Sequence, residues 1–294
     1  HGICRRLLKI HWREAGIAEY FTILDSQDQL RMIKRIVKSQ NLDDNLYDPK
    51  ALQSFINTQK DKGKRHNNAS NDDDKYIEIY KEYDEACRQT NSVDFADLIL
   101  LTYEMFKNNP NILNYYGNRF KNIMVDEFQD TNTLQFNLLK LINGDSGSLY
   151  AVGDDDQSIY GWRGARSRNI QSFEEEFNNV EIFKLEQNYR STNEILSVAN
   201  SLISKNIERL GKNLWTKSDK GQPVYLYEAY SGDDESKFII DKIQEYVAKG
   251  YKRSDIALLY RSNFLSRRLE EELNSRSIPY KIYGGFRFFE RAEV

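Results

Sequence analysis

Cysteine, histidine and long apolar runs are scarce in this sequence. Its two cysteines, Cys4 and Cys87, cannot build the disulfide framework of a small secreted protein, so reduced thiols are expected. Together with three histidines they show no spacing typical of a zinc site. No apolar segment approaches the length of a membrane span, and no signal peptide is expected at the start. These absences predict a cytoplasmic protein with no membrane partner.

A strong charge of one sign is also missing. The 294 residues carry a net charge of −3, so composition gives no indication of a nucleic-acid partner. Basic side chains gather at two places, namely Arg5, Arg6, Lys9 and Arg13, and Lys60, Lys62, Lys64 and Arg65. Either group could meet phosphate, although such runs are more often solvated faces. With 39% hydrophobic and 30% charged residues, the chain is expected to form about two globular domains.

The predicted elements change in kind along the chain. Residues 26–90 are polar and predict helices, the first of them begun by a capping box of Ser26 and Gln29. Farther on, strands alternate with helices. The strands are predicted at 121–125, 148–152, 180–185, 224–229, 256–260 and 280–283, and the helices at 134–142, 192–204, 235–248 and 264–275. Such alternation predicts an α/β fold with parallel sheets, in which ligands bind at the carboxyl ends of the strands.

The first group of candidate site residues is VDEFQDTN at residues 125–132, where a predicted strand ends. Asp126 could hold Mg²⁺ against nucleotide phosphates, because a hard cation prefers carboxylate oxygen. Glu127 could take a proton from an attacking water. An acidic turn that caps the next helix through Asp130 explains the same residues, and on this motif alone it is the favoured interpretation.

The second group is GDDDQSIYGWRGA at residues 153–165, again after a predicted strand. Gln157 could contact a phosphate or the attacking water. Tyr160, Trp162 and Arg163 could receive a base and its phosphate, since aromatic side chains stack on the bases of unpaired DNA. The alternative is a tight loop whose aromatic side chains fill a core, and this motif alone favours it.

The third group is LEQNYRST at residues 185–192, where a predicted strand gives way to a helix. Arg190 could stabilise charge on a transferring phosphoryl group, and Tyr189 could stack on an adenine. An arginine held in a surface salt bridge explains the motif about equally well.

Taken together, the three motifs closely resemble motifs II, III and IV of the UvrD, PcrA and Rep family of superfamily 1 DNA helicases. The resemblance extends to VDFADL at residues 93–98, to LYRSN at 259–263 and to the stretch 283–291. It covers essentially the whole chain, and residues 23–30 and 209–215 are nearest to the UvrD members.

The resemblance implies two RecA-like motor domains, both incomplete, which close on ATP and step along single-stranded DNA. Residues 1–24 and 93–188 would form the first domain, 25–92 its all-helical insertion, and 189–294 the first half of the second. It further implies 3′ to 5′ polarity and a role in DNA repair or replication. The implied partners are single-stranded DNA, its junctions with duplex DNA, and DNA repair proteins.

The resemblance also implies roles for individual residues. Asp126 would bind Mg²⁺, Glu127 would activate water, and Gln157 would couple phosphate to DNA. Tyr189 would pack on adenine, and Arg190 would reach the γ-phosphate of ATP. The DNA contacts would come from Tyr160, Trp162, Arg163, Arg261, Ser262, Asn263 and His1, with Trp162 as the stacking platform.

One motif of the family is missing from these residues. The sequence nowhere contains G-x-x-x-x-G-K-[ST], whose backbone amides and lysine cradle phosphates, and Gly211 and Lys212 are followed by Asn213. The chain also begins at His1 without methionine, so a fragment of a longer protein is expected. We therefore predict negligible ATPase and helicase activity for the 294 residues alone.

Two other functions remain open from the sequence. A non-catalytic DNA-binding or partner-binding remnant of a helicase would bind single-stranded DNA whether or not nucleotide is present. A nuclease-linked relative would share these motifs, although the short insertion and the lack of a nuclease-like carboxylate cluster count against it.

Overall fold

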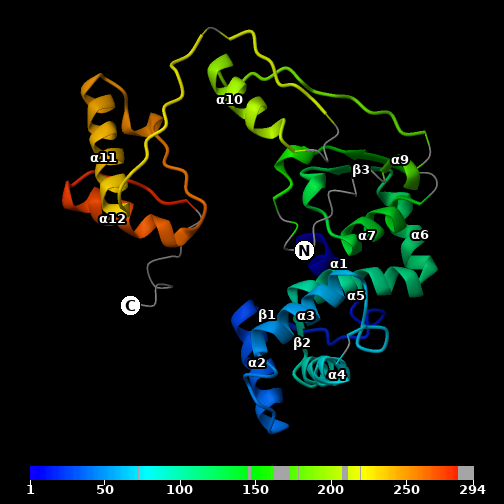
Figure 1. Cartoon of the computed structure of the whole chain (residues 1–294). Helices are drawn as coiled ribbons and strands as arrows, with labels where there is room; N and C mark the ends of the chain where they lie inside the picture. Colours follow the sequence, from blue (N-terminus) through cyan, green and yellow to red (C-terminus); the bar gives the residue numbers. More distant parts are fainter. Residues whose placement is uncertain are drawn as a thin grey trace. The chain divides into compact units, whose positions relative to one another are not determined.

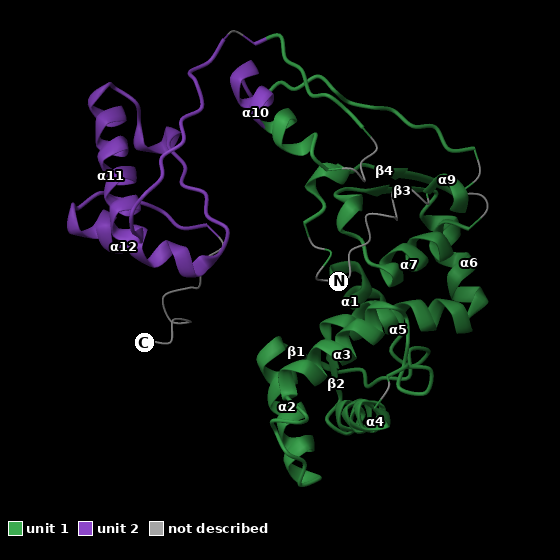
Figure 2. Cartoon of the chain, viewed as in Figure 1, with its two compact units in different colours: residues 1–190, 199–217 green, residues 191–198, 218–294 purple. Residues whose placement is uncertain are grey.

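The computed structural model describes residues 1–71, 73–144, 147–159, 161, 173–177, 179–206, 211–218 and 220–283 (Figure 1). The chain divides into two compact units, which Figure 2 colours separately. The first unit comprises residues 1–190 and 199–217, and the second comprises residues 191–198 and 218–294. Among the described helices, none is both long enough and apolar enough to cross a membrane.

Three helices of the first unit share a core of their own. They are α2 (Ser26–Ser39), α3 (Pro49–Asp61) and α4 (Asp74–Gln89). Apolar side chains recur on one face of each helix, so the three faces can be buried together. This core contains Leu24, Ile33, Ile36, Val37, Leu52, Ile56, Ile79, Tyr80, Tyr83 and Cys87. The predicted helical region therefore folds around a core separate from the rest of the unit.

The start of α2 differs from the prediction. Asp25 is the N-cap, and its carboxylate accepts hydrogen bonds from the amides of Gln27 (2.8 Å) and Asp28 (2.7 Å). Ser26 is already the first helical residue, so the predicted capping box of Ser26 and Gln29 is wrong. The buried Gln29 amide donates instead to Asn57 and Asp94, because the tertiary structure offers it partners that are distant in sequence.

A second core lies where α1 (Gly2–Ile10), α5 (Phe95–Asn108), α6 (Pro110–Arg119) and α7 (Thr133–Asn143) pack together. The buried side chains include Leu8, Leu100, Phe106 and Leu134. The parallel strands β1 (Thr22–Leu24) and β2 (Ser92–Asp94) lie where the chain passes from one core to the other. Helix α7 begins at a capping box of Asn132 and Gln135 and ends at Gly144, as the sequence predicts for its C-terminus.

The strands that carry the first two candidate motifs are paired. Strands β3 (Asn122–Val125) and β4 (Ser148–Ala151) run parallel, with Val125 opposite Ala151. Short 3-10 turns follow them, η1 (Phe128–Asp130) and η2 (Asp155–Gln157), and α9 (Phe173–Glu176) comes later. The fold class is α/β with parallel strands, as predicted. Because the strands are parallel, both motifs begin at the same end of this sheet, the carboxyl ends of β3 and β4.

The second unit is built on helices. Its main pair is α11 (Gly232–Ala248) and α12 (Ser266–Ser275), around a small core of Ile240, Ile243 and Leu273. The turns η4 (Arg253–Asp255) and η5 (Asn263–Leu265) connect them. Helix α10 (Asn193–Ile203) contains the sequence boundary between the two units, which falls after residue 198. Its first residues belong to the second unit and its last residues to the first.

Four predicted strands do not form as strands. Residues 180–185, 224–229, 256–260 and 280–283, all within the described part, adopt no assigned secondary structure. A strand needs a neighbour to accept and donate its backbone hydrogen bonds, and these segments have none in the sheets that the structure describes. Apolar side chains there stay exposed, as at Leu226 (97%) and Leu259 (96%). Alternating sequence is therefore not sufficient for a strand.

Candidate functional site

The carboxyl end of β3 presents two exposed acidic side chains, Asp126 and Glu127. Glu127 has a left-handed backbone with φ of 50°, a conformation that costs a non-glycine residue on the order of 1–3 kcal/mol. The turn is held by a bond from the Glu127 amide to Asp126 Oδ1 (2.9 Å) and by one from the Phe128 amide to the carbonyl of Val152 (2.9 Å). The strained turn directs the chain from β3 back toward the end of β4.

Gln129 joins the two strand ends. Its side chain is buried, its amide nitrogen donates to Glu127 Oε2 (2.7 Å), and its amide oxygen accepts from the backbone of Asp154 (3.0 Å). Gly153 makes this approach possible, since a Cβ there would lie 2.8 Å from the Gln129 oxygen. Gln129 was not among the residues predicted from the sequence. Its position inside VDEFQD, between Glu127 and Asp130, was the signal that could have indicated it.

Gln157 belongs to the same hydrogen-bonded chain. It ends η2, whose N-cap is Asp154, and its side-chain amide donates to Asp154 Oδ2 (2.7 Å). The structure therefore connects Glu127 to Gln157 through Gln129 and Asp154. The predicted DNA contacts Tyr160, Trp162 and Arg163 lie outside the described residues.

Lys212 approaches the same loop from a distant part of the sequence. Its ammonium group is hydrogen-bonded to Asp154 Oδ1 and lies 3.6 Å from Asp155 and 3.7 Å from Asp156. Burial opposes ionisation of Asp154, but the hydrogen bonds from Lys212 and Gln157 hold its pKa below the ordinary value. Burial likewise opposes the charge of Lys212, yet the carboxylates raise its pKa.

Asp154, Asp155 and Asp156 have carboxylate oxygens within 4.8 Å of one another, a spacing that would suit a cation. The Lys212 ammonium group already provides positive charge at this place. Asp126, at the end of β3, is therefore the better candidate for a metal ligand, since Mg²⁺ in nucleotide sites needs only one or two protein carboxylates.

The third motif pairs with the segment that follows Lys212. Trp215 donates its amide to the carbonyl of Glu186 (3.0 Å) and accepts from the amide of Asn188 (2.7 Å). The Asn188 side chain then accepts from the amide of Arg190 (2.9 Å). Tyr189 is 83% exposed and Arg190 is exposed, so both side chains can reach a ligand.

The remaining candidates make no described contact with the residues above in the part of the chain that the structure describes. Arg261, Ser262 and Asn263 are exposed at the start of η5 in the second unit. His1 is exposed in the first unit, and its ring meets that of Phe95 edge-on at 5.8 Å. These residues are accessible to a ligand.

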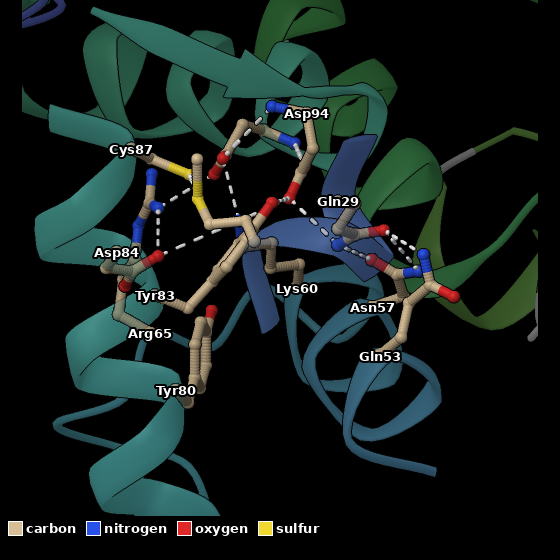
Figure 3. A network of polar contacts seen from close by, with 12 residues as sticks. Gln29, Gln53, Asn57, Lys60, Arg65, Tyr80, Tyr83, Asp84, Cys87 and Asp94 are labelled. Carbon is tan, nitrogen blue, oxygen red and sulfur yellow. Dashed lines mark hydrogen bonds and ion pairs between the residues drawn. The ribbon is translucent and has the colours of Figure 1, made fainter. Parts of the chain in front are cut away.

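The basic run at residues 60–65 has a role that the sequence did not predict (Figure 3). Lys60 is fully buried in the first unit, and its ammonium nitrogen lies 2.7 Å from Asp97, 2.8 Å from Asp94 and 3.7 Å from Asp84. Tyr83 also donates to Asp94 (2.9 Å). Burial opposes the charge of Lys60, but the three carboxylates raise its pKa above the ordinary value.

Arg65 continues this buried network. It donates to Asp97 Oδ1 (2.8 Å) and makes two hydrogen bonds to Glu104 (2.9 and 2.8 Å). Burial favours the neutral form of Asp97, yet Lys60 and Arg65 hold its pKa below the ordinary value. Both sequence-based interpretations of Lys60 and Arg65, phosphate contact and solvated face, are therefore wrong. These cations bind α3 and the loop after it to α4 and α5.

Comparison with known protein families gives two matches that together cover nearly the whole chain. Residues 1–178 match the UvrD/REP helicase N-terminal domain, and residues 183–294 match the UvrD-like helicase C-terminal domain. The division between the matches falls just before the LEQNYRST motif. The family predicted from the three motifs is confirmed.

Individual relatives agree with these matches. The chain is 49% identical to DNA helicase II of Haemophilus influenzae and 48% identical to DNA helicase II of Escherichia coli, each over 298 aligned positions. It is 40% identical to ATP-dependent DNA helicase PcrA of Staphylococcus aureus. In each case the whole chain is covered, but only 41% of the relative.

Proposed function

The chain belongs to the UvrD/REP helicase family, and from this membership we propose that it forms part of an ATP-dependent DNA helicase. The proposed activity is 3′ to 5′ translocation on single-stranded DNA, in DNA repair or replication. The names of the relatives, DNA helicase II and ATP-dependent DNA helicase PcrA, support the helicase activity. The polarity and the repair role rest on the family resemblance.

One observation of this chain carries the proposal. Hydrogen bonds link Glu127 to Gln129, Gln129 to Asp154, and Asp154 to Gln157. The Glu127 carboxylate, which can accept a proton from water, is therefore connected by hydrogen bonds to the Gln157 amide, which can contact a phosphate. A nucleotide-driven motor needs such a connection, because hydrolysis has to change the loop that leads to the DNA.

The residues at this end of the sheet fit a nucleotide-bound magnesium ion. Asp126 would hold Mg²⁺, since its carboxylate is exposed at the end of β3 and only one of its oxygens accepts the local backbone bond. The ion would neutralise phosphate charge when it is bound. Glu127, steadied by the Gln129 amide, would take the proton from water.

The third motif would complete the nucleotide site. Tyr189 would pack on the adenine of ATP, and Arg190 would stabilise charge on the transferring γ-phosphoryl group. Both side chains are exposed, as contact with a nucleotide requires. The backbone of this motif is hydrogen-bonded to Trp215, so the two side chains project from a braced segment.

The proposed DNA contacts follow the family motifs. Tyr160, Trp162 and Arg163 would receive a base and its phosphate, and stacking of one base on Trp162 would contribute about 1–3 kcal/mol. Arg261, Ser262, Asn263 and His1 would contact the DNA backbone. Single-stranded DNA, its junction with duplex DNA and DNA repair proteins are the proposed partners.

The 294 residues alone are proposed to lack ATPase and helicase activity. They contain no G-x-x-x-x-G-K-[ST] loop, and that loop supplies the amides and the lysine that hold the phosphates. The experiment therefore needs a longer protein. These residues would replace the matching segment of DNA helicase II from Haemophilus influenzae, which they resemble over their whole length.

Glu127→Gln in this exchanged protein tests the proposal. DNA-stimulated ATP hydrolysis is expected to fall about 10²–10⁴-fold, because a positioned general base is lost. Binding of a fluorescent ATP analogue should persist, since the amide keeps the shape of the side chain. Glu181→Gln, at an exposed glutamate, is the matched control and should hydrolyse ATP normally.

Two results would contradict the proposal. Unchanged hydrolysis by the Glu127→Gln protein would remove Glu127 from its role. An exchanged protein that binds single-stranded DNA but neither hydrolyses ATP nor changes its DNA affinity with nucleotide would support the non-catalytic remnant.

A further inference from the structure

We propose that residues 212–215, the bridging segment, connect the loop at residues 154–158 (the Gln157 loop) to the segment at residues 186–190 that carries Arg190. Within this connection, Lys212 is a positioning residue for Gln157. Its consequence for catalysis rests on the proposed function. The bridging segment contains none of the residues that the family motifs assign to nucleotide or DNA. All of its contacts described below lie within the first unit.

The first end of the bridging segment holds the Gln157 loop through Asp154. One carboxylate oxygen of Asp154 accepts from Lys212, and the other accepts from the side chain of Gln157 (2.7 Å). Asp155 and Asp156 lie within 4 Å of the same ammonium group. Without this cation, three carboxylates within 4.8 Å of one another would repel, and the loop would open.

The second end holds the backbone ahead of Arg190. The amide of Asn213 donates to the side chain of Glu186 (3.1 Å). The amide of Trp215 donates to the carbonyl of Glu186, and its carbonyl accepts from the amide of Asn188. Asn188 then receives the amide of Arg190. Each of these bonds restrains the segment that presents Tyr189 and Arg190.

The middle of the bridging segment is fixed as well. Leu214 exchanges hydrogen bonds with the side chain of Asn200, which donates to the Leu214 carbonyl (2.8 Å) and accepts from its amide (3.3 Å). Four consecutive residues are thus bonded to three places in the unit, namely Asp154, Asn200 and the segment 186–188. Three extended residues span at most about 10 Å. The bridging segment is therefore too short to absorb a displacement of one end, and the other end is displaced as well.

Amide hydrogen exchange in the chain itself tests the connection. In Lys212→Met, exchange is expected to become about tenfold faster at residues 154–158 and also at residues 186–190, because both lose the same restraint. Lys212→Arg keeps the charge and should retain protection at both places. Lys217→Met, at an exposed lysine two residues after the bridging segment, is the matched control.

A second variant approaches from the opposite end. Glu186→Ala removes the acceptor of the Asn213 amide and should speed exchange at residues 154–158, since coupling between two sites is reciprocal. It also keeps the proposal testable if Lys212→Met does not fold. Faster exchange confined to the mutated end in either variant, or at neither end, would overturn the proposal.

ATP hydrolysis by the exchanged protein tests the role of Lys212 apart from the role of Glu127. In the exchanged protein, Lys212→Met should lower kcat about tenfold or more, because a misplaced Gln157 acts less well. The change in KM for ATP should be smaller, and Lys212→Arg should keep kcat close to that of the exchanged protein with Lys212. A protein with coupled exchange but no ATP hydrolysis in any form would contradict the proposed function alone. Normal hydrolysis by Lys212→Met would overturn the positioning role alone.

Discussion

Asp61, the last residue of α3, has a carboxyl group in an unfavourable place. Burial and the nearby charge of Asp94 raise its pKa to about 6, above the ordinary value of an aspartate. The folded chain therefore binds this proton more tightly than the unfolded chain does. The free energy of unfolding must therefore fall as pH rises from about 4 to about 6, and it stays reduced at higher pH.

Asp61→Asn should remove this loss. The amide oxygen can still accept the hydrogen bond that Asn132 donates to Asp61 (2.8 Å). At pH 8 the variant is expected to be more stable by about 1–2 kcal/mol, after allowance for solvent screening of a partly exposed group. Urea unfolding at pH 4 and pH 8 measures the difference, which should shrink at pH 4.

The control for this prediction is Asp44→Asn, at an exposed aspartate. It should leave stability nearly unchanged at both pH values. Equal stability of Asp61→Asn and the unmodified chain at pH 8 would show that the Asp61 carboxylate is not destabilising.

Single residues also decide the backbone path at the carboxyl ends of β3 and β4. Glu127 adopts a left-handed backbone, and Gly153 leaves room for the Gln129 side chain. The sequence motif indicated that acidic residues end a strand here. Which of its neighbours would turn inward was not predictable, because Gln129 meets Asp154 across a separation of 25 residues.

At the level of elements, the Lys60 network joins α3 to α4 and to the start of α5. The buried carboxylates of Asp84, Asp94 and Asp97 share the charges of Lys60 and Arg65. Removing one partner from such a cluster leaves charge buried without compensation, which costs more than the net contribution of the pair. Removal of one member of this network is therefore expected to destabilise this part of the unit strongly.

Lys60→Met is expected to destabilise the chain by about 3–5 kcal/mol, because the methionine fills the space but leaves carboxylates uncompensated. Urea unfolding followed by circular dichroism measures the loss. Lys62→Met, at an exposed neighbour, should change stability by less than about 0.5 kcal/mol. Adding Asp94→Asn to Lys60→Met should recover part of the loss, because it removes one uncompensated carboxylate. Asp94 is the N-cap of α5, and asparagine can also cap a helix.

A loss below about 1 kcal/mol in Lys60→Met would contradict this account. It would mean that the carboxylates become protonated or hydrated at little cost. Failure of Asp94→Asn to recover any stability would point to packing of the lysine stem rather than charge.

At the level of the whole molecule, the two units differ in how much apolar surface they bury. The described part of the second unit has a core of three buried apolar residues, whereas the core of α2, α3 and α4 alone has ten. Because a fully buried apolar side chain contributes roughly 1.5–3 kcal/mol, the second unit has much less to hold it together. The units are therefore expected to open separately.

Native-state hydrogen exchange measures this difference. Amides of α11 and α12 should exchange at least about a hundredfold faster than those of α3, α4 and α5, through local opening of the second unit. Addition of low concentrations of urea should speed exchange in α11 first. Protection in α11 equal to that in α4 would show that the two units unfold as one.

The sequence by itself determined the family and the position of most helices. Three motifs with many specified residues sufficed for the first. For helices like α7, the helical spacing of apolar residues from Leu134 to Ile142 and the following Gly144 sufficed. It also located the ends of β3 and β4, because a short apolar run followed by polar residues is a local pattern.

Only the tertiary structure decided which extended segments pair and where the charges go. Residues 224–229 alternate like a strand, yet they have no paired neighbour among the described strands. Lys60 reads as surface charge, yet it binds Asp94 and Asp97, residues 34 and 37 positions away. The physical reason is the same in both cases. Strand pairing and charge burial depend on partners that folding brings together, and no local pattern contains those partners.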